Sequence, residues 1–299
     1  MKAIYSLVFL IYSSLVYSQA DNNPVYYFGQ TPPDTIPMIF APGTICLENR
    51  FEARGAFSPD GKLFYFTITN EDFSSQKVLF CEYLKNMWTI PDTASFSKAF
   101  NNHEPFFSYD GQKLFFTSDR DKQTKENTRD LFFIKKLKSG WTEPVKLDTP
   151  INSGYTEYFF SQSKNGTIYF ASNRPGGYGL FDTYFIKSDN GKYEKLNNMG
   201  STINYGYAAD PCIAPDEKYL VFTSARTVDA DNVDLYVSFN MNGVWSEPVN
   251  MGNLINTKAN EYSPFLSPDG KYLFFVRHDG KNGDIYWINA SIINKFRSK

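Results

Sequence analysis

Acidic residues recur at one position of a repeated segment, and these are the side chains in this sequence that could do chemistry. Glu104, Glu157 and Asp210 each lie four residues before a serine or an alanine at the end of a predicted strand. Arg54 and Ser263 hold the same position in the first and last repeats. Two carboxylates can act as general acid and as nucleophile or base on a glycosidic bond. Their oxygens can equally hold a sugar, a peptide or a cation in a polar pocket.

The neighbours of these acids widen the candidate site. His103 precedes Glu104 and forms a histidine–carboxylate pair with it, but the sequence assigns this pair no serine or cysteine nucleophile. Tyr155 and Tyr207 could stack on sugar rings, although most aromatic side chains in such a chain pack between sheets. Because acids recur at equivalent positions, the pattern favours a structural channel lining that bridges neighbouring repeats. The arginine and the serine at this position break the symmetry, and they leave a ligand-binding pocket open as the alternative.

Motifs for other chemistry are absent from the sequence. It contains no GxSxG, GxxxxGKS/T, HExxH or EF-hand pattern. Its two histidines and three scattered cysteines, without a CxxC pair, predict neither a metal site nor a disulfide framework. We therefore expect no metal and no cofactor, and we expect the cysteines to be small buried side chains.

Composition excludes two further classes of protein. The formal net charge of −2 lacks the basic excess that a dedicated nucleic-acid binder uses to neutralise phosphates. With 18% aromatic and only 21% charged residues, the chain has enough apolar surface to fold, which excludes a mostly disordered protein.

Three series of residues repeat with a common period. The turn aspartates are Asp60, Asp110, Asp216 and Asp269, with separations of 50 residues between the first two and 53 between the last two. The aromatic markers are Trp88, Trp141, Tyr193 and Trp245, spaced 53, 52 and 52 residues apart. The asparagine markers are Asn101, Asn152, Asn204 and Asn256, spaced 51, 52 and 52 residues apart. Three series in register show that the chain is built from one repeated unit.

Each repeat predicts four short antiparallel strands, which indicates an all-β β-propeller with five blades. Runs such as 105–108 and 114–117 flank a Pro/Asp/Gly turn and are too rich in Phe and Tyr to prefer a helix. The fifth repeat lacks its fourth strand, and residues 36–46 match that strand in the fourth repeat. We expect this N-terminal strand to close the last blade and cover its open edge. Six blades remain possible only if residues 21–35 add strands.

The face of the ring that carries the longer loops is the predicted binding face. These loops connect the second and third strands at 118–129, 172–180, 224–233 and 277–283, and variable loops on a rigid scaffold often bind partners. The innermost strands begin at the same face, so the acids are expected at the mouth of the channel. Arginines ending the second strands are expected to pair with aspartates beginning the third strands; the pairs are Arg120–Asp130, Arg174–Asp182 and Arg226–Asp234.

The segments FSPDGKLFYF and SPDGKYLFFV, with the neighbouring Ile-Asn and Trp-x-x-Pro elements, resemble the PD40 (WD40-like) propeller repeat. This repeat is known from the C-terminal domain of the periplasmic protein TolB and from secreted proteins of Bacteroidetes-type bacteria. The resemblance covers residues 36–290 and implies the propeller fold, but its motif residues shape turns and strands and do not specify a function. The N-terminal α/β domain of TolB has no counterpart here, so TolB's place in the envelope machinery does not transfer directly.

The N-terminus has the layout of a secretory signal peptide. A lysine at position 2 precedes the largely apolar stretch 4–17, and Ser18 offers a small residue for cleavage before Gln19. The predicted organisation is a signal peptide at 1–18, an extension at 19–35, the propeller at 36–290 and a tail at 291–299. We expect export to the periplasm or cell surface of a Gram-negative bacterium, with no membrane span in the mature chain.

These observations favour a non-catalytic binding or scaffold protein that recognises a protein partner or a glycan through its loop face. The alternative is a carbohydrate-active enzyme of the glycoside hydrolase type, with Glu104, Glu157 and Asp210 as candidate catalytic residues; this rests on fold-level analogy. A third possibility is a docking subunit of a larger envelope assembly. The ligand-binding candidates are Arg54, His103, Glu104, Tyr155, Glu157, Tyr207 and Asp210.

Overall fold

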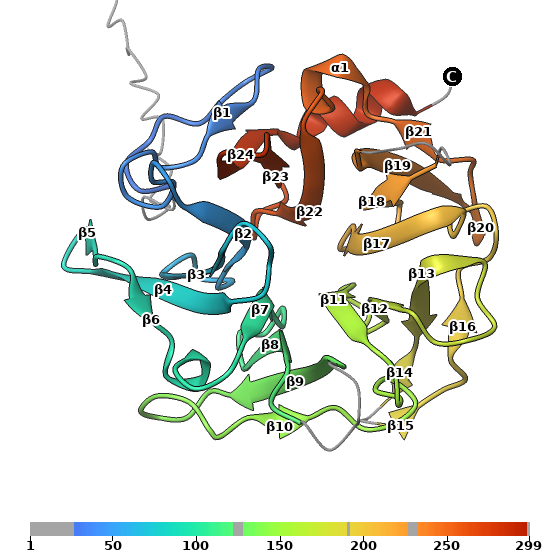
Figure 1. Cartoon of the computed structure of the whole chain (residues 1–299), viewed down its shortest axis with the longest axis horizontal. Coiled ribbons are helices and arrows are strands. Elements are labelled where there is room, and N and C mark those ends of the chain that lie inside the picture. The colour runs from blue at the N-terminus through green and yellow to red at the C-terminus, as the bar shows by residue number, and fades with distance from the viewer. Residues whose placement is uncertain (1–26, 122–127, 190–191, 227–231, 298–299) are drawn as a thin grey trace, which may run out of the picture.

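A computed structural model describes residues 27–121, 128–189, 192–226 and 232–297, and strands make up most of it. The strands surround a centre (Figure 1), and their antiparallel pairing groups them into five sets. Parallel pairs between neighbouring sets join the first with the fifth and the third with the fourth into two nine-stranded sheets. The helices are short: α1 (Gly252–Ile255) and two 3₁₀ helices, Ser95–Ser97 and Ala290–Phe296. The described residues are therefore nearly all β, as the runs rich in Phe and Tyr predict.

The first four sets follow one another along the chain. The first contains β2 (Phe51–Phe57), β3 (Leu63–Thr69), β4 (Gln76–Leu84) and β6 (Asp92–Thr93). The second contains β7 (Asn102–Phe107), β8 (Lys113–Ser118), β9 (Asp130–Lys135) and β10 (Val145–Lys146). The third contains β11 (Glu157–Gln162), β12 (Ile168–Ser172), β13 (Gly179–Ile186) and β16 (Asn197–Asn198). The fourth contains β17 (Gly206–Ile213), β18 (Tyr219–Ala225), β19 (Asp234–Met241) and β21 (Val249–Asn250).

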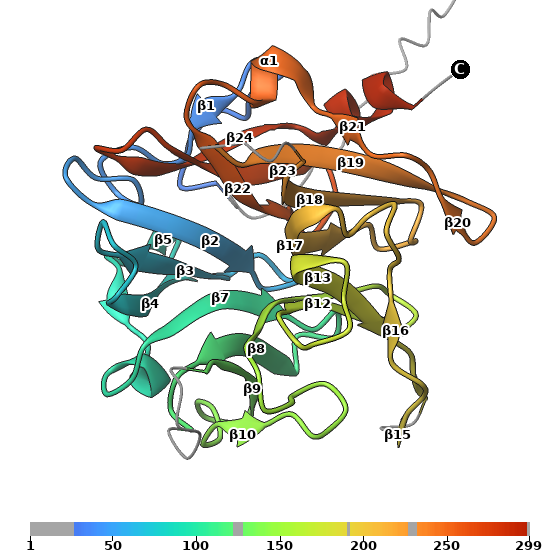
Figure 2. The same cartoon turned by 45° about the vertical axis from the view of Figure 1, so that its right-hand side comes forward.

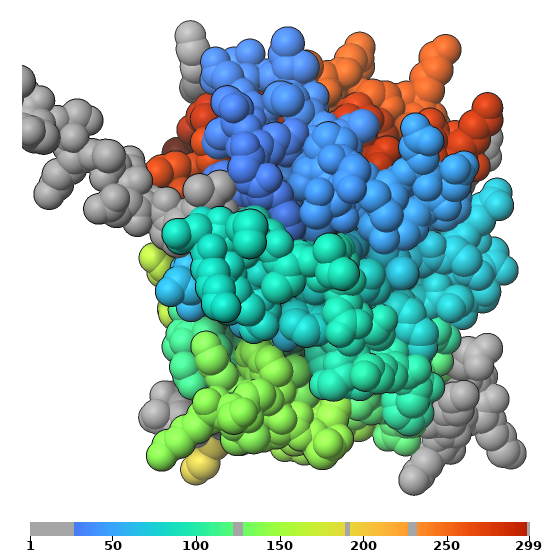
Figure 3. Space-filling model, turned by 90° about the vertical axis from the view of Figure 1, so that its left-hand side faces the viewer, coloured from blue at the N-terminus to red at the C-terminus, as the bar shows by residue number. Residues whose placement is uncertain are grey.

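The fifth set joins the two ends of the chain. It contains β22 (Asn260–Leu266), β23 (Tyr272–His278), β24 (Gly283–Asn289) and β1 (Met38–Ile39). β1 pairs antiparallel with β24, with Met38 opposite Trp287. Figure 3 shows the N-terminal segment lying between the C-terminal strands and the first repeat. Two short extra strands, β5 (Met87–Trp88) and β20 (Val244–Trp245), pair with β4 and β19. Two others, β14 (Ser188–Asp189) and β15 (Lys192–Tyr193), pair with each other.

Neighbouring sets lie face to face around the centre (Figure 2). The hydrophobic cores lie between them. One core joins Tyr65 and Val78 of the first set to Leu114 and Phe116 of the second. Between the second and third sets, the rings of Phe115 and Phe160 stack with centroids 3.9 Å apart. Large flat side chains fill the space between packed sheets, which explains the high aromatic content.

The Ser–Pro–Asp–Gly type segments form the turns between the first and second strands. In the second set, Ser108 Oγ accepts a hydrogen bond from the N–H of Lys113 (2.9 Å) and donates one to Asp110 Oδ1 (2.6 Å). Gly111 follows with φ of 66°, a left-handed conformation that glycine adopts at little cost. In the third set Asn165 replaces the aspartate as the acceptor. The repeated residues therefore stabilise the turn.

The asparagine markers complete the hydrogen bonding of the third strand in their sets. The N–H of Leu235 donates to Asn256 Oδ1 (2.9 Å), and Asn256 Nδ2 donates to the Leu235 carbonyl (2.9 Å). Asn152 and Asn204 make the same two bonds to Leu131 and Thr183. One amide side chain thus serves a backbone N–H and a backbone C=O that lie next to each other.

Other residues take this role in the first and fifth sets. The N–H of Val78 donates to Ser97 Oγ (2.8 Å), so Asn101, which fits the spacing of the asparagine series, is not its structural equivalent. In the fifth set the N–H of Ile285 lies 3.3 Å from Cys46 Sγ. All three cysteines are buried and unbridged, as predicted.

The predicted arginine–aspartate pairs do not form among the described residues. Arg174 donates to the carbonyls of Pro150 (3.0 Å) and Ile151 (2.6 Å), and Arg226 donates to the carbonyl of Thr202 (2.9 Å). Asp130 instead forms an ion pair with Lys146. Asp182 and Asp234 accept hydrogen bonds from the side-chain amides of Asn198 and Asn250. These arginines therefore stabilise the segment that precedes their set, because they donate hydrogen bonds to its backbone carbonyls.

The segments predicted to flank the propeller also pack on it. Phe28 stacks on Trp88 with ring centroids 4.3 Å apart, and Gln30 exchanges hydrogen bonds with the backbone of Ile39 and Ala41. In the predicted tail, Ile292 and Ile293 are buried in the core beside the fourth and fifth sets. The predicted signal peptide lies outside the described residues.

Candidate functional site

The innermost strands share a bulge that positions the candidate residues. The register of β7 against β8 shifts between His103 and Phe106, and β2, β11, β17 and β22 shift at the corresponding place. Backbone φ is positive at Glu104 (59°), Phe159 (58°), Asp210 (51°) and Ser263 (51°). A bulge re-aims a side chain, and left-handed conformations of non-glycine residues cluster at functional sites.

The third repeat is out of register with the sequence prediction. Its turn serine is Ser163, whose Oγ bonds Asn165 within the turn, and not Ser161. The residue four positions before Ser163 is Phe159, which also carries the positive φ. The sequence alignment therefore misplaced Glu157 by two residues, because this repeat has a divergent turn.

Glu157 lies apart from the other two acids and has its own partners. It is fully buried and accepts hydrogen bonds from Ser153 Oγ (2.5 Å) and Arg174 Nη2 (3.1 Å). Glu261, its equivalent in the last repeat, accepts from Thr257 Oγ1 (2.7 Å) and Arg277 Nε (2.8 Å). Burial raises the pKa of Glu157, and the Ser153 hydrogen bonds oppose that rise. These contacts make Glu157 a brace at the start of its strand.

A cavity of about 350 Å³ lies at the end of the channel where second and third strands are connected. Five aromatic side chains form part of its wall: Phe73, Tyr158, Phe159, Tyr207 and Tyr262. Polar side chains that join them include Gln76, His103, Glu104, Arg129, Asp210 and His278. An aromatic wall with a few converging polar groups is the usual composition of a ligand site.

Glu104 and Asp210 come from different repeats and meet at Ser263. Ser263 Oγ donates to Glu104 Oε1 (3.3 Å), and the backbone N–H of Ser263 donates to Asp210 Oδ2 (3.1 Å). Thr223 Oγ1 donates a second, short bond to Asp210 Oδ2 (2.5 Å). The Arg54 Nε lies 3.9 Å from Glu104 Oε2, which is a loose ion pair. The sequence placed these four innermost-strand residues at one level, and the structure brings them together.

Burial is the largest cause of the pKa shifts of Glu104, Asp210 and His103. It raises the pKa of Glu104 to about 7, against the opposing pull of the Arg54 guanidinium. Burial and the nearby Glu104 charge raise the pKa of Asp210 to about 7. Burial also lowers the pKa of His103 well below its usual value, so this imidazole is neutral at physiological pH. The two carboxyls are therefore poised to change charge near neutrality.

Several buried polar atoms around the cavity have no hydrogen-bond partner among the described residues. They are His103 Nε2, Glu104 Oε2, Asp210 Oδ1, Tyr262 Oη and His278 Nε2. An unsatisfied buried polar group costs about 1–3 kcal/mol, so such groups gathered at a cavity point to an occupant.

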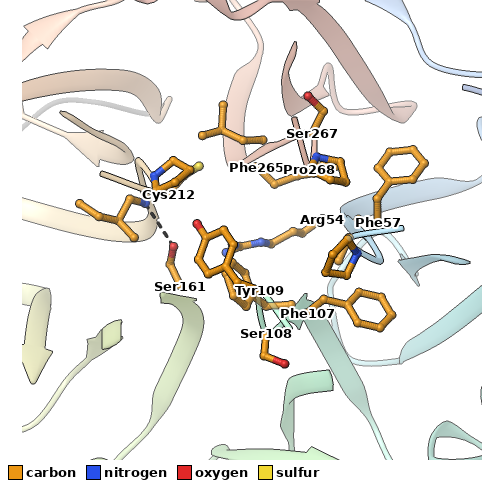
Figure 4. Close-up of a pocket in the computed structure, with 17 residues that line it drawn as sticks. Arg54, Phe57, Phe107, Ser108, Tyr109, Ser161, Cys212, Phe265, Ser267 and Pro268 are labelled. Atoms are coloured by element: carbon orange, nitrogen blue, oxygen red, sulfur yellow. Dashed lines mark hydrogen bonds between the residues drawn. The ribbon is translucent and has the colours of Figure 1, made fainter. Parts of the chain in front are cut away.

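The remaining predicted residues divide between the cavity and other places. Tyr207 lines the cavity, whereas Tyr155 is 43% exposed and is not among the lining residues. A smaller pocket of about 90 Å³ lies at the opposite end of the channel. Figure 4 shows Arg54 extending beside Tyr109 in it. Arg54 is almost fully buried, and it lies between this pocket and Glu104 of the larger cavity.

Sequence reasoning missed several residues of the cavity, among them Tyr262, Arg129 and His278. Tyr262 and Ser263 are neighbours at the bulge of β22, so the repeat alignment could have found the tyrosine. Arg129 and His278 adjoin connections between second and third strands, where sequence varies between repeats and carries no positional signal.

The comparisons with known proteins bear on the fold. No family model matches the chain, and no curated protein matches it. A structure described as a TolB from Agrobacterium tumefaciens superposes with a TM-score of 0.53 at 16% identity, over 80% of this chain and 77% of that one. The chain has a TolB-like β-propeller fold.

Two further structures are similar at comparable scores. A protein of unknown function from Dyadobacter fermentans has a TM-score of 0.51 at 13% identity, over 89% of this chain and 85% of that one. An exo-β-1,3-galactanase from Clostridium thermocellum has a TM-score of 0.50 at 12% identity, over 84% of this chain and 62% of that one. At these identities the likeness concerns the fold alone. No helix in the described ranges is long and apolar enough to cross a membrane.

Proposed function

We propose that the chain is an exported binding protein, a five-bladed propeller that recognises a protein partner or a glycan through its loop face. Five sets of strands and the pairing of β1 with β24 support the blade number and the closure by the N-terminal segment. The signal-peptide layout of residues 1–18 supports export, and the PD40 resemblance supports a periplasmic or surface location in a Gram-negative bacterium.

The observation that carries the binding proposal is the cavity at the loop face. Its aromatic wall surrounds unpartnered polar atoms of Glu104 and Asp210, and both side chains are buried in the protein. A propeller needs no such cavity to be stable, because its cores lie between the blades. A group that satisfies these atoms would therefore gain binding energy from positions already fixed by the fold.

Glycoside hydrolysis remains the second candidate, because two carboxyls from different blades share one cavity and a galactanase is among the similar folds. A hydrolase needs one protonated and one ionised carboxyl on opposite sides of the scissile bond. Here Ser263 bridges Glu104 and Asp210, and both have their pKa raised to about 7. This arrangement favours binding over catalysis.

The test is a glycan-array screen and a capture experiment from envelope extracts, using the purified wild type, Glu104→Gln and Asp210→Asn. The control is Asp216→Asn, which changes an exposed turn carboxylate at the opposite end of the channel. Binding that is lost in the two cavity variants and kept in the control supports the proposal. Sugar release that depends on both carboxyls would replace it with the hydrolase, and binding unaffected by either variant would contradict it.

A further inference from the structure

Some charged side chains that line the loop-face cavity have no ion-pair partner among the described residues. Glu104 lies near Arg54, but among the described residues Asp210 has no cation within ion-pair distance. Arg129 lies on the cavity wall, and no described carboxylate forms an ion pair with it. Its guanidinium lies over the Tyr158 ring, 5.7 Å from the centroid, and donates weakly to the Phe73 carbonyl (3.5 Å). With respect to the described residues, one cavity thus contains a negative and a positive side chain that have no ion-pair partner.

The unpartnered atoms show which group belongs at the negative end. Glu104 Oε2 and Asp210 Oδ1 are acceptors without donors among the described residues, and the Tyr262 hydroxyl can also accept. An ammonium has three N–H donors and no acceptor, so it fits three such oxygens. The aromatic rings of Tyr207 and Tyr262 add a surface that attracts cations.

We infer that the cavity binds a zwitterionic amino compound, a free α-amino acid or the amino-terminal residue of a peptide. The ligand's ammonium faces Asp210 and Glu104, and its carboxylate or first carbonyl faces Arg129. The aromatic wall takes the side chain, since about 350 Å³ is enough for one amino-acid residue. This inference rests on the proposed function, because it names the ligand of the same cavity.

Titration should accompany binding. The charged or titratable groups around the two carboxyls are Arg54, His103, Arg129, Tyr158, Tyr207, Tyr262 and His278. Because the carboxyl pKa values are raised to about 7, an ammonium binds more weakly at pH 6 than at pH 8, and binding at pH 7 releases protons. A neutral sugar would show neither effect.

The experiment uses the purified full-length protein and the twenty amino acids, with phenylalanyl-glycine as the peptide probe. A thermal-shift screen selects the ligand that stabilises most, and calorimetry then compares it with its N-acetyl and amide derivatives at pH 6 and pH 8. We expect N-acetylation to abolish binding. The amide should bind if the site takes a peptide amino terminus, and it should fail if the site takes a free amino acid.

Variants locate the ligand in the cavity. Asp210→Asn and Arg129→Gln should each weaken binding roughly tenfold or more, and Asp216→Asn should leave it unchanged. Arg129 is only half-buried, so its variant remains informative if Asp210→Asn does not fold.

The outcomes separate this inference from the proposed function. If no amino acid or peptide stabilises the protein, or if the N-acetyl form binds equally well, the inference of a zwitterionic ligand is wrong. The proposed function survives that result if a glycan or protein still binds through Asp210, and it fails if no ligand is sensitive to the cavity variants.

Discussion

Glu104 and Asp210 are two buried carboxyls, and Ser263 donates a hydrogen bond to each of them. The two carboxyls lie close enough for the charge of Glu104 to raise the pKa of Asp210. Sequence analysis identified both, because they recur at one position of a repeat that is easy to align. It failed at Glu157, where the divergent turn at Ser163 shifted the alignment by two residues. Periodicity can place a residue on the right strand, but whether it faces the channel depends on a bulge, and a bulge inserts one residue without a sequence mark.

At the residue scale, we predict that the protein is more stable at pH 5.5 than at pH 8. The pKa values of Glu52, Glu104 and Asp210 are raised to about 7, above their values in an unfolded chain. The folded state therefore binds protons more tightly, and this stabilisation is present at low pH and lost as the pH rises through 7. Each pKa unit is worth about 1.4 kcal/mol, so we expect Tm to fall by roughly 2–4 °C or more between the two pH values.

Calorimetric melting across this pH range measures the effect, and Glu104→Gln is the informative variant. The amide cannot ionise, so its melting temperature should depend less on pH than that of the wild type. A wild-type Tm that is constant or rises toward pH 8 would show that these carboxyls are ionised in the folded protein without cost.

At the element scale, the repeated side chains explain most of what could be predicted. Turn serines, aspartates and glycines fix the first hairpin of the first, second and fifth sets, and the asparagine markers complete the third strand of the second, third and fourth. The series predicted the strands and their order in outline, and the N-terminal strand β1 pairs with β24 of the last repeat. It could not predict that Ser97 replaces Asn101, because a hydroxyl and an amide supply the same acceptor from different backbone positions.

We predict that Asn256→Ala destabilises the fold by about 1–3 kcal/mol. The side chain is buried, and its loss leaves the N–H of Leu235 without an acceptor inside the fourth set. Asn253→Ala, three residues earlier and exposed, is the matched control and should change the free energy of unfolding by less than about 0.5 kcal/mol. Urea unfolding of both variants measures the difference. Equal stability of the two would show that the Asn256 hydrogen bonds add nothing over bonds to water.

At the scale of the whole molecule, the fifth set repeats the chemistry of the other four with residues from both ends of the chain. Cys46 offers its sulfur to the N–H of Ile285, as Asn256 offers its amide oxygen to Leu235. Phe40, next to β1, is fully buried, and its N–H donates to the Ile285 carbonyl (2.8 Å). The N-terminal segment therefore takes the place of a fourth strand in hydrogen bonding and in packing.

We predict that Phe40→Ala destabilises the whole propeller. The centroid of the Phe40 phenyl ring lies 5.2 Å from that of Phe274 and 5.4 Å from that of Trp287, both in the last set. It lies 5.5 Å from the ring centroid of Phe64 in the first set. Removing a buried phenylalanine costs about 3–5 kcal/mol, and here the loss falls on the contact between first and last sets. Equilibrium unfolding measures it, with Ile36→Ala as the control because that side chain is 68% exposed. If the segment closes the ring, Phe40→Ala also makes the chain ends accessible to protease while the fold persists. A loss below about 1 kcal/mol with unchanged proteolysis would mean that the strands of the last set hold together without the N-terminal segment.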